Sequence, residues 1–195
     1  MGAAEGVPVA AAQSFMAVRV ENVFCACFAE HYRTQLRGGA EEPLYLPAHS
    51  ATSEHVLTYR GDYFASALHE VAHWCLAGEQ RRLLRDFGYW YTPESRNVEQ
   101  QLAFETVECK PQALEWFFSR ACGYRFQVSV DNLDLAGRGL LNTTAFQRAV
   151  LAQALQWQQQ GLPVRAAVFY AALCREFGTA VLASGQQFSS AEFDR

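Results

Sequence analysis

The sequence lacks the features that would place a chain in a membrane or on nucleic acid. No apolar run approaches the roughly 20 residues that span a bilayer. The formal net charge is −4, so no basic excess favours binding to nucleic acid. Residues 1–14 are rich in alanine but contain no lysine or arginine, which a secretory signal would need. We therefore expect a cytoplasmic protein with neither a membrane nor a direct nucleic-acid partner.

Cysteine pairs at metal-binding spacing are absent as well. The chain has six cysteines, but none of them forms a CxxC pair, and most have apolar neighbours in the sequence. Such cysteines are typical of buried free thiols in a reducing compartment. A cysteine-rich metal site is therefore not indicated.

Length and apolar content favour one domain. The chain has 195 residues, of which 50% are hydrophobic, and this is enough for a substantial core. We predict an α+β fold, a single, mostly helical domain with a small sheet. We expect this domain to cover residues 15–180, with a disordered tail over 1–14 and a polar, frayed tail over 181–195.

Hydrophobic periodicity and turn residues locate the expected elements. A first helix is predicted over 15–37, ending at the glycine pair 38–39. A second helix covers 64–76, with Asp62 as its expected N-cap. Further helices are predicted from about residue 99, before Gly161, and from Pro163 to about Phe177. Extended segments are predicted at 44–46, 56–60 and 126–130.

The most specific pattern is an HExxH motif formed by His69, Glu70 and His73 within the predicted helix over 64–76. Side chains four residues apart lie on the same face of a helix, so the two imidazoles can bind one metal ion. The glutamate beside the first histidine can reach a metal-bound water or the substrate. The alternative is a pair of surface histidines with Glu70 as an exposed charge.

Two histidines leave a metal site one protein ligand short. Glu105 and Glu108 lie three residues apart in the next predicted helix and therefore share a face. We favour Glu108, because the run 108–113 (ECKPQA) resembles the third-ligand segment of small HExxH metalloproteins. Glu105 then supports a ligand or faces the substrate.

The predicted ligands do not determine which metal is bound. Two histidines and one carboxylate suit non-haem Fe(II), and they also suit zinc, in which case Glu70 would be the general base of a peptidase. The 2-oxoglutarate oxygenases carry an HxD motif and a distant histidine on a jelly roll. The chain lacks that pattern and is too helical for that fold, so 2-oxoglutarate is not expected as a cofactor.

An aromatic run follows the metal helix. Residues 87–91 (FGYWY) place four aromatic side chains in five positions, which fits neither one helical face nor one strand face. Tyr89, Trp90 and Tyr91 are candidates for the wall of a substrate cleft, or alternatively for a wedge in the core. Asp86 is either an acceptor for a ligand histidine or a turn residue.

Together, these motifs resemble the bacterial elongation factor P hydroxylase family over residues 42–133. The matching runs are 42–48 (EPLYLPA), 64–75 (FASALHEVAHWC), 81–82 (RR), 86–91 (DFGYWY), 107–114 (VECKPQAL) and 131–133 (DNL). The resemblance implies hydroxylation of a lysine of elongation factor P that already carries a β-lysyl group, as the final step of its modification. It also implies a two-histidine, one-carboxylate metal site, which we carry over to His69, His73 and one of the two glutamates.

Three functions are therefore considered. The first is an Fe(II)-dependent hydroxylase of the monooxygenase type, which uses molecular oxygen and acts on elongation factor P. The others are a small zinc peptidase and a non-catalytic, metal-stabilised interaction domain. In the hydroxylase, Glu70 orients a ligand or receives a substrate ammonium group, and Glu105 and Asp86 offer further carboxylates. A basic patch of Arg81, Arg82 and Arg85 is a candidate docking surface for an acidic partner.

Overall fold

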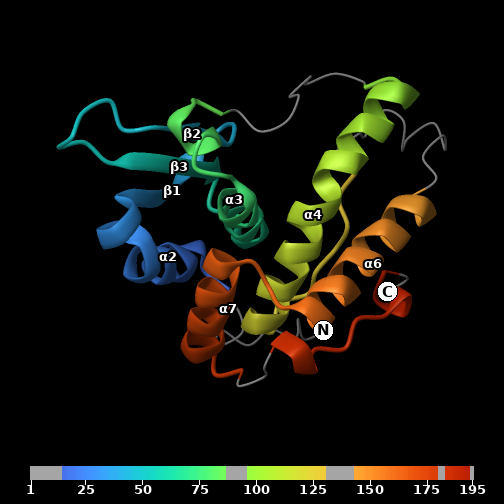
Figure 1. The fold of residues 1–195 in the computed structure, drawn as a ribbon. Helices are drawn as coiled ribbons and strands as arrows, with labels where there is room; N and C mark the ends of the chain where they lie inside the picture. Colours follow the sequence, from blue (N-terminus) through green and yellow to red (C-terminus); the bar gives the residue numbers. More distant parts are fainter. Residues whose placement is uncertain (1–14, 87–95, 131–142, 180–182, 194–195) are drawn as a thin grey trace, which may run out of the picture.

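The computed structural model describes residues 15–86, 96–130, 143–179 and 183–193, and its fold is α+β, as predicted (Figure 1). These residues form a three-stranded sheet of β1 (Thr34–Ala40), β2 (Leu44–Leu46) and β3 (His55–Arg60). They also form α2 (Ala17–Tyr32), α3 (Phe64–Leu76), α4 (Val98–Cys122), α6 (Thr144–Gln160) and α7 (Val164–Phe177). Short 3-10 turns are η1 (Arg81–Leu83), η2 (Ala183–Gly185) and η3 (Ser190–Glu192). None of the helices in the described ranges has the length and apolar character needed to cross a bilayer.

β3 is the central strand of the sheet. It pairs in parallel with β1, where Leu36 lies opposite Leu57, and antiparallel with β2, where Tyr45 lies opposite the same Leu57. All three side chains are buried. α2 packs on β1 and α3 packs on β3, so the sheet supports the helix that carries the HExxH motif.

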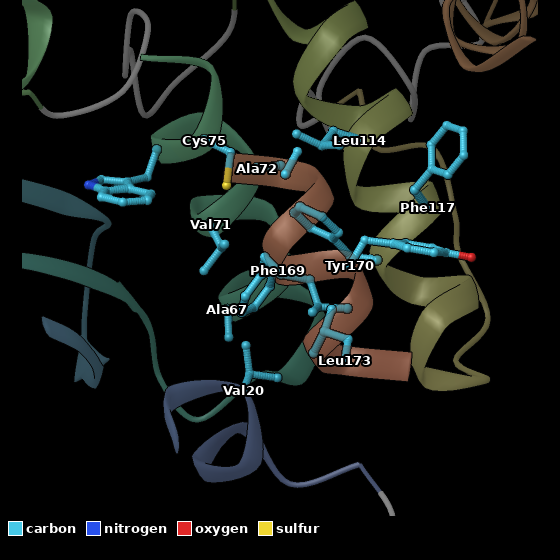
Figure 2. Packing of buried hydrophobic residues seen from close by; sticks show 14 of the residues in the cluster. Val20, Ala67, Val71, Ala72, Cys75, Leu114, Phe117, Phe169, Tyr170 and Leu173 are labelled. Atoms are coloured by element: carbon cyan, nitrogen blue, oxygen red, sulfur yellow. The ribbon is translucent and has the colours of Figure 1, made fainter. Parts of the chain in front are cut away.

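The hydrophobic core lies where α2, α3, α4 and α7 meet. Figure 2 shows Val71 of α3 and Phe117 of α4 on either side of Phe169 of α7. The Phe169 ring centroid lies 6.2 Å from that of Phe24 in α2 and 5.0 Å from that of Phe118 in α4. One aromatic residue of α7 thus links α2 to α4, and α3 packs directly on α4.

The first predicted helix is too long. α2 ends at Tyr32, and Arg33 adopts the left-handed conformation with φ 49°. The residues expected as its last turn, 34–37, instead begin β1 and pair with β3. This pairing joins segments about 20 residues apart, and such tertiary contacts override local propensity.

The predicted strand over 126–130 is also wrong, because no strand pairs with it among the described residues. Side chains of α4 bind its backbone instead. Gln112 accepts a hydrogen bond from the Ser129 N–H at 3.0 Å and donates one to the Ser129 carbonyl at 2.7 Å. The Gln101 amide and the Arg96 guanidinium both donate to the Val130 carbonyl. Side chains of α4, together with Arg96, thus satisfy backbone groups of this segment, as a neighbouring strand would.

Two smaller predictions also need correction. Asp62 is not the cap of α3, because the N-cap is Tyr63 and no side-chain hydrogen bond is present there. The C-terminal residues expected as a frayed polar tail pack on the core over 183–193. Phe188 and Phe193 lie with their ring centroids 4.7 and 4.8 Å from that of buried Trp116. The predicted tail over 1–14 lies outside the described residues.

Candidate metal centre

α3 brings the two histidines of the HExxH motif together. Its buried stripe includes Leu68, Val71 and Ala72, so the helix packs with this face on the core. His69 and His73 lie beside that stripe, each partly exposed, with their Nε2 atoms 3.1 Å apart. The spacing of four residues therefore produces the convergence of imidazoles that the sequence predicted.

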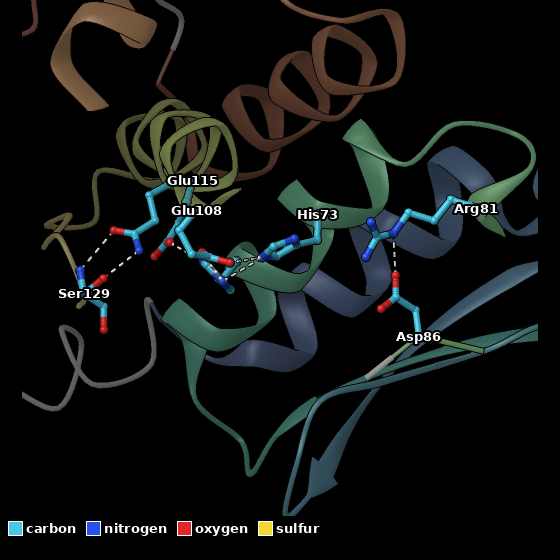
Figure 3. A network of polar contacts seen from close by, with 8 residues as sticks. His73, Arg81, Asp86, Glu108, Glu115 and Ser129 are labelled. Carbon is cyan, nitrogen blue, oxygen red and sulfur yellow. Dashed lines mark hydrogen bonds and ion pairs between the residues drawn. The ribbon is translucent and has the colours of Figure 1, made fainter. Parts of the chain in front are cut away.

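α4 supplies a carboxylate to the same point. The helix begins with a capping box between Asn97 and Gln100, and its packing on α3 buries Glu108 to 4% exposure. The Oε1 atom of Glu108 lies 3.1 Å from His73 Nε2, and its Oε2 atom lies 3.3 Å from His69 Nε2. One ligand atom from each of these three residues lies within 4.8 Å of the others (Figure 3).

A second carboxylate of α4 orients the first histidine. Glu115 Oε2 lies 2.8 Å from His69 Nδ1, and the Glu115 side chain is almost fully buried. An ionised carboxylate can only accept a hydrogen bond, so Nδ1 carries a proton, and Nε2 is the nitrogen that would present its lone pair to a bound metal. Glu115 was not predicted from the sequence as a site residue. The available signal was its spacing of seven residues from Glu108, which places both on one face of a helix.

Within the cluster, neighbouring charges and burial shift the pKa values in opposite directions. Burial lowers the pKa of His69, but the carboxylates of Glu108 and Glu115 outweigh this effect and raise the pKa to about 10. Burial raises the pKa of Glu108, but His73 and His69 outweigh it and lower the pKa to about 2. Without a metal, His69 and Glu108 therefore form an imidazolium–carboxylate pair, whose proton a metal cation would displace.

The three side chains fit a metal of the kind predicted. Glu108 Oε2 is buried and makes no hydrogen bond to any described residue, although such atoms usually have a partner. Two imidazole nitrogens point at each other and at this carboxylate. A cation between them would satisfy all three donors, and two histidines with one carboxylate suit Fe(II) or zinc.

The other predicted site residues occupy different positions. Glu105 lies outside the three-residue cluster, and its carboxylate accepts a hydrogen bond from Gln101 at 3.1 Å. Asp86 pairs with Arg81 at 2.5 Å, and both line a cavity that also includes Glu70 and His73. The position beside a ligand histidine that we considered for Asp86 is taken by Glu115. Tyr89, Trp90 and Tyr91 lie outside the described residues.

The predicted basic patch is only partly available as a surface. Arg81 is paired with Asp86, and the Arg82 guanidinium donates to the Ala77 carbonyl at 3.0 Å. Of the three arginines, Arg85 is the one that is exposed. The three arginines therefore do not form the single exposed patch that the sequence predicted.

Comparison with known proteins identifies a family. The model of the family described as elongation factor P hydroxylase matches residues 23–188, which is most of the chain. One relative is the elongation factor P lysine hydroxylase of Haemophilus influenzae, which is 44% identical over 157 residues. The matched region covers 80% of this chain and 86% of that relative, so the similarity includes the three-residue cluster as well as its surroundings.

Proposed function

Because the chain belongs to the elongation factor P hydroxylase family, we propose that it hydroxylates elongation factor P on the lysine that carries a β-lysyl group. We further propose that this is the final step of the modification and that it consumes molecular oxygen at an Fe(II) centre. The reaction would take place in the cytoplasm, where elongation factors act. The observation that carries the proposal is the similarity over most of both chains to a relative named as such a hydroxylase.

The proposed ligands of the metal are His69, His73 and Glu108. A redox-active metal held there would supply the activation of oxygen that an unreactive C–H bond requires, which zinc does not offer. The protein's own contribution is positioning. Glu115 holds the Nδ1 proton of His69, and packing of α3 against α4 fixes both histidines relative to Glu108. Because these elements all belong to one core, we propose one catalytic domain that begins near residue 15 and includes residues 183–193, which also pack on that core.

The zinc peptidase alternative has less support. The three donors alone also suit a zinc peptidase in which Glu70 is the general base, and the family similarity argues against this reading. In a hydroxylase, no water needs to be deprotonated for attack on a peptide. Glu70→Gln should therefore retain the metal and weaken turnover. Peptide cleavage by the zinc-loaded protein, lost in this variant, would favour the peptidase.

The proposed function is tested most simply in cells. Elongation factor P is purified from a strain that lacks this chain and from the same strain supplied with wild type, Glu108→Gln or Glu105→Gln. Mass spectrometry of the modified lysine should show one additional oxygen with wild type and with Glu105→Gln, although less completely if Glu105 contacts the substrate. Neither the deletion strain nor Glu108→Gln should show it. An unchanged mass in the deletion strain would remove the proposal.

A further inference from the structure

A cavity of about 190 Å³ opens beside the metal cluster. His73 is shared by both, since it belongs to the cluster and lines the cavity. Figure 3 shows the Arg81–Asp86 pair on the opposite side of His73 from Glu108. Much of the wall is aliphatic and comes from β2, β3, α3 and α4, through Leu44, Leu57, Leu76, Val107 and Pro111. Such a wall fits an extended hydrocarbon chain better than a polar group.

The charges that line the cavity differ in how far they are already neutralised. The Arg81 guanidinium is paired with Asp86 at 2.5 Å. The Arg82 guanidinium donates to the Ala77 carbonyl and lies 5.4 Å from the ring centroid of Tyr32. Lys110 is exposed, so water and salt screen its charge. The positive groups of the lining are thus engaged within the protein or hydrated.

Glu70 differs from these groups. Its carboxylate lines the cavity one position after His69, and no described residue donates a hydrogen bond to it. It is only partly exposed. A carboxylate removed from water without a donor is costly, and a bound ammonium group would relieve that cost with a charge-assisted hydrogen bond.

We infer that this cavity receives the extended aliphatic amine of the substrate and that Glu70 is the counter-ion of its ammonium group. The aliphatic wall covers the methylene stem, and Glu70 determines specificity by requiring a positive charge close to the metal cluster. This inference rests on the proposed function for the identity of the amine as a lysine-derived side chain. The binding site itself can be tested without it.

The test compares two small probes, pentylamine and pentanol, which have the same alkyl chain but differ in charge. Amines of this kind are protonated at neutral pH, as lysine is. The full chain is loaded with zinc, which has no unpaired electrons, and the methyl signals of Leu57 and Leu76 are followed by NMR as each probe is added. Glu70→Gln removes the charge with the same shape. Glu79→Gln is the matched control, because Glu79 is an exposed glutamate in the turn that follows α3 and does not line the cavity.

We expect pentylamine to shift these methyl signals and to bind at least about tenfold more tightly than pentanol, since a hydrogen bond to a charged group is worth that much. Glu70→Gln should remove this preference, whereas Glu79→Gln should retain it. Equal binding of the two probes to wild type would overturn the inference without any variant, as would preferential binding of succinate, which would indicate an anion site. Hydroxylation of elongation factor P by Glu70→Gln is measured separately. If this variant no longer prefers pentylamine but still hydroxylates the factor as wild type does, Glu70 is not the counter-ion of the substrate, and the proposed function is unaffected.

Discussion

At the residue scale, the hydrogen bond between His69 and Glu115 determines which imidazole nitrogen is available to a metal. The bond is 2.8 Å long, and Glu115 is buried at 8% exposure, so water cannot easily replace the carboxylate. Partners of this kind raise the basicity of a ligand histidine and hold its ring in place. Glu115 is therefore a positioning residue, since it acts through His69.

The matching prediction concerns Glu115→Gln. The amide can still accept a hydrogen bond from Nδ1, but it lacks the negative charge, so the affinity for Fe(II) or zinc should fall about tenfold or more. Competition with a coloured chelator measures this affinity directly. Glu99→Gln, an exposed glutamate in the first turn of the same helix, is the control and should bind as wild type does. Unchanged affinity in Glu115→Gln would show that His69 does not depend on this partner.

A second prediction at this scale separates the two candidate carboxylate ligands. Glu108→Gln, His69→Ala and His73→Ala should each lose the metal while remaining folded, because each removes one of the three converging donors. Glu105→Gln should keep it, because Glu105 bonds to Gln101. Metal content by elemental analysis, with circular dichroism for folding, is the measurement. Metal lost in Glu105→Gln and kept in Glu108→Gln would reverse our assignment.

Spacing along helices explains which site residues could be predicted from the sequence. Two residues of one helix that are three or four positions apart are neighbours in space, so the contact between His69 and His73 could be predicted from the sequence. The choice of Glu108 over Glu105 depended on a resemblance between short segments. The bond between Glu115 and His69 joins residues 46 positions apart, and only the packing of α3 on α4 reveals it.

At the scale of elements, the close approach of β1 to β3 constrains the edge of the sheet that supports α3. A Cβ atom on Gly38 would lie 2.6 Å from the Tyr59 hydroxyl and 2.9 Å from the Gly61 carbonyl oxygen. Tyr59 is buried, and its hydroxyl donates to Glu21 at 2.8 Å, so it cannot move aside freely. The glycine that the sequence suggested as a helix stop is in fact needed for strand packing.

Gly38→Ala should therefore lower the free energy of unfolding by about 1 to 3 kcal/mol, the usual cost of overpacking. Gly78→Ala is the matched control, because a Cβ there meets no atom within 4 Å. Chemical denaturation of both variants measures the difference. Equal stability of the two would mean that the sheet adjusts to the extra methyl group.

The elements also show where local sequence patterns fail. α3 and α7 begin and end close to the predicted residues, and α6 ends just before Gly161, as predicted. β1 and the segment 126–130 were mispredicted because their partners are remote in sequence, one a parallel strand and the other the side chains of α4. Both errors concern backbone hydrogen bonds whose partners the local pattern does not contain.

At the scale of the whole molecule, the C-terminal residues complete the core on the side of α4. Phe188 and Phe193 contact Trp116, and Glu192 forms an ion pair with Arg120 at 2.5 Å. Removing 183–195 should expose Trp116, shift tryptophan fluorescence to longer wavelength and lower the free energy of unfolding by about 3 kcal/mol or more. Removing 1–14, the predicted disordered tail, should change neither. Unchanged fluorescence and stability after the C-terminal deletion would show that this segment does not stabilise the core.

The central claim, that this fold presents a metal-dependent hydroxylase of elongation factor P, is best tested by reconstitution with purified components. The full chain is loaded anaerobically with Fe(II) or with zinc, mixed with β-lysylated elongation factor P and a chemical reductant, and exposed to isotopically labelled oxygen gas. We predict that the mass of the modified lysine rises by one labelled oxygen atom with Fe(II) and wild type. We predict no change with zinc or with Glu108→Gln. Equal incorporation of labelled oxygen by the zinc-loaded protein or by Glu108→Gln would contradict this claim. So would the absence of labelled oxygen with Fe(II)-loaded wild type.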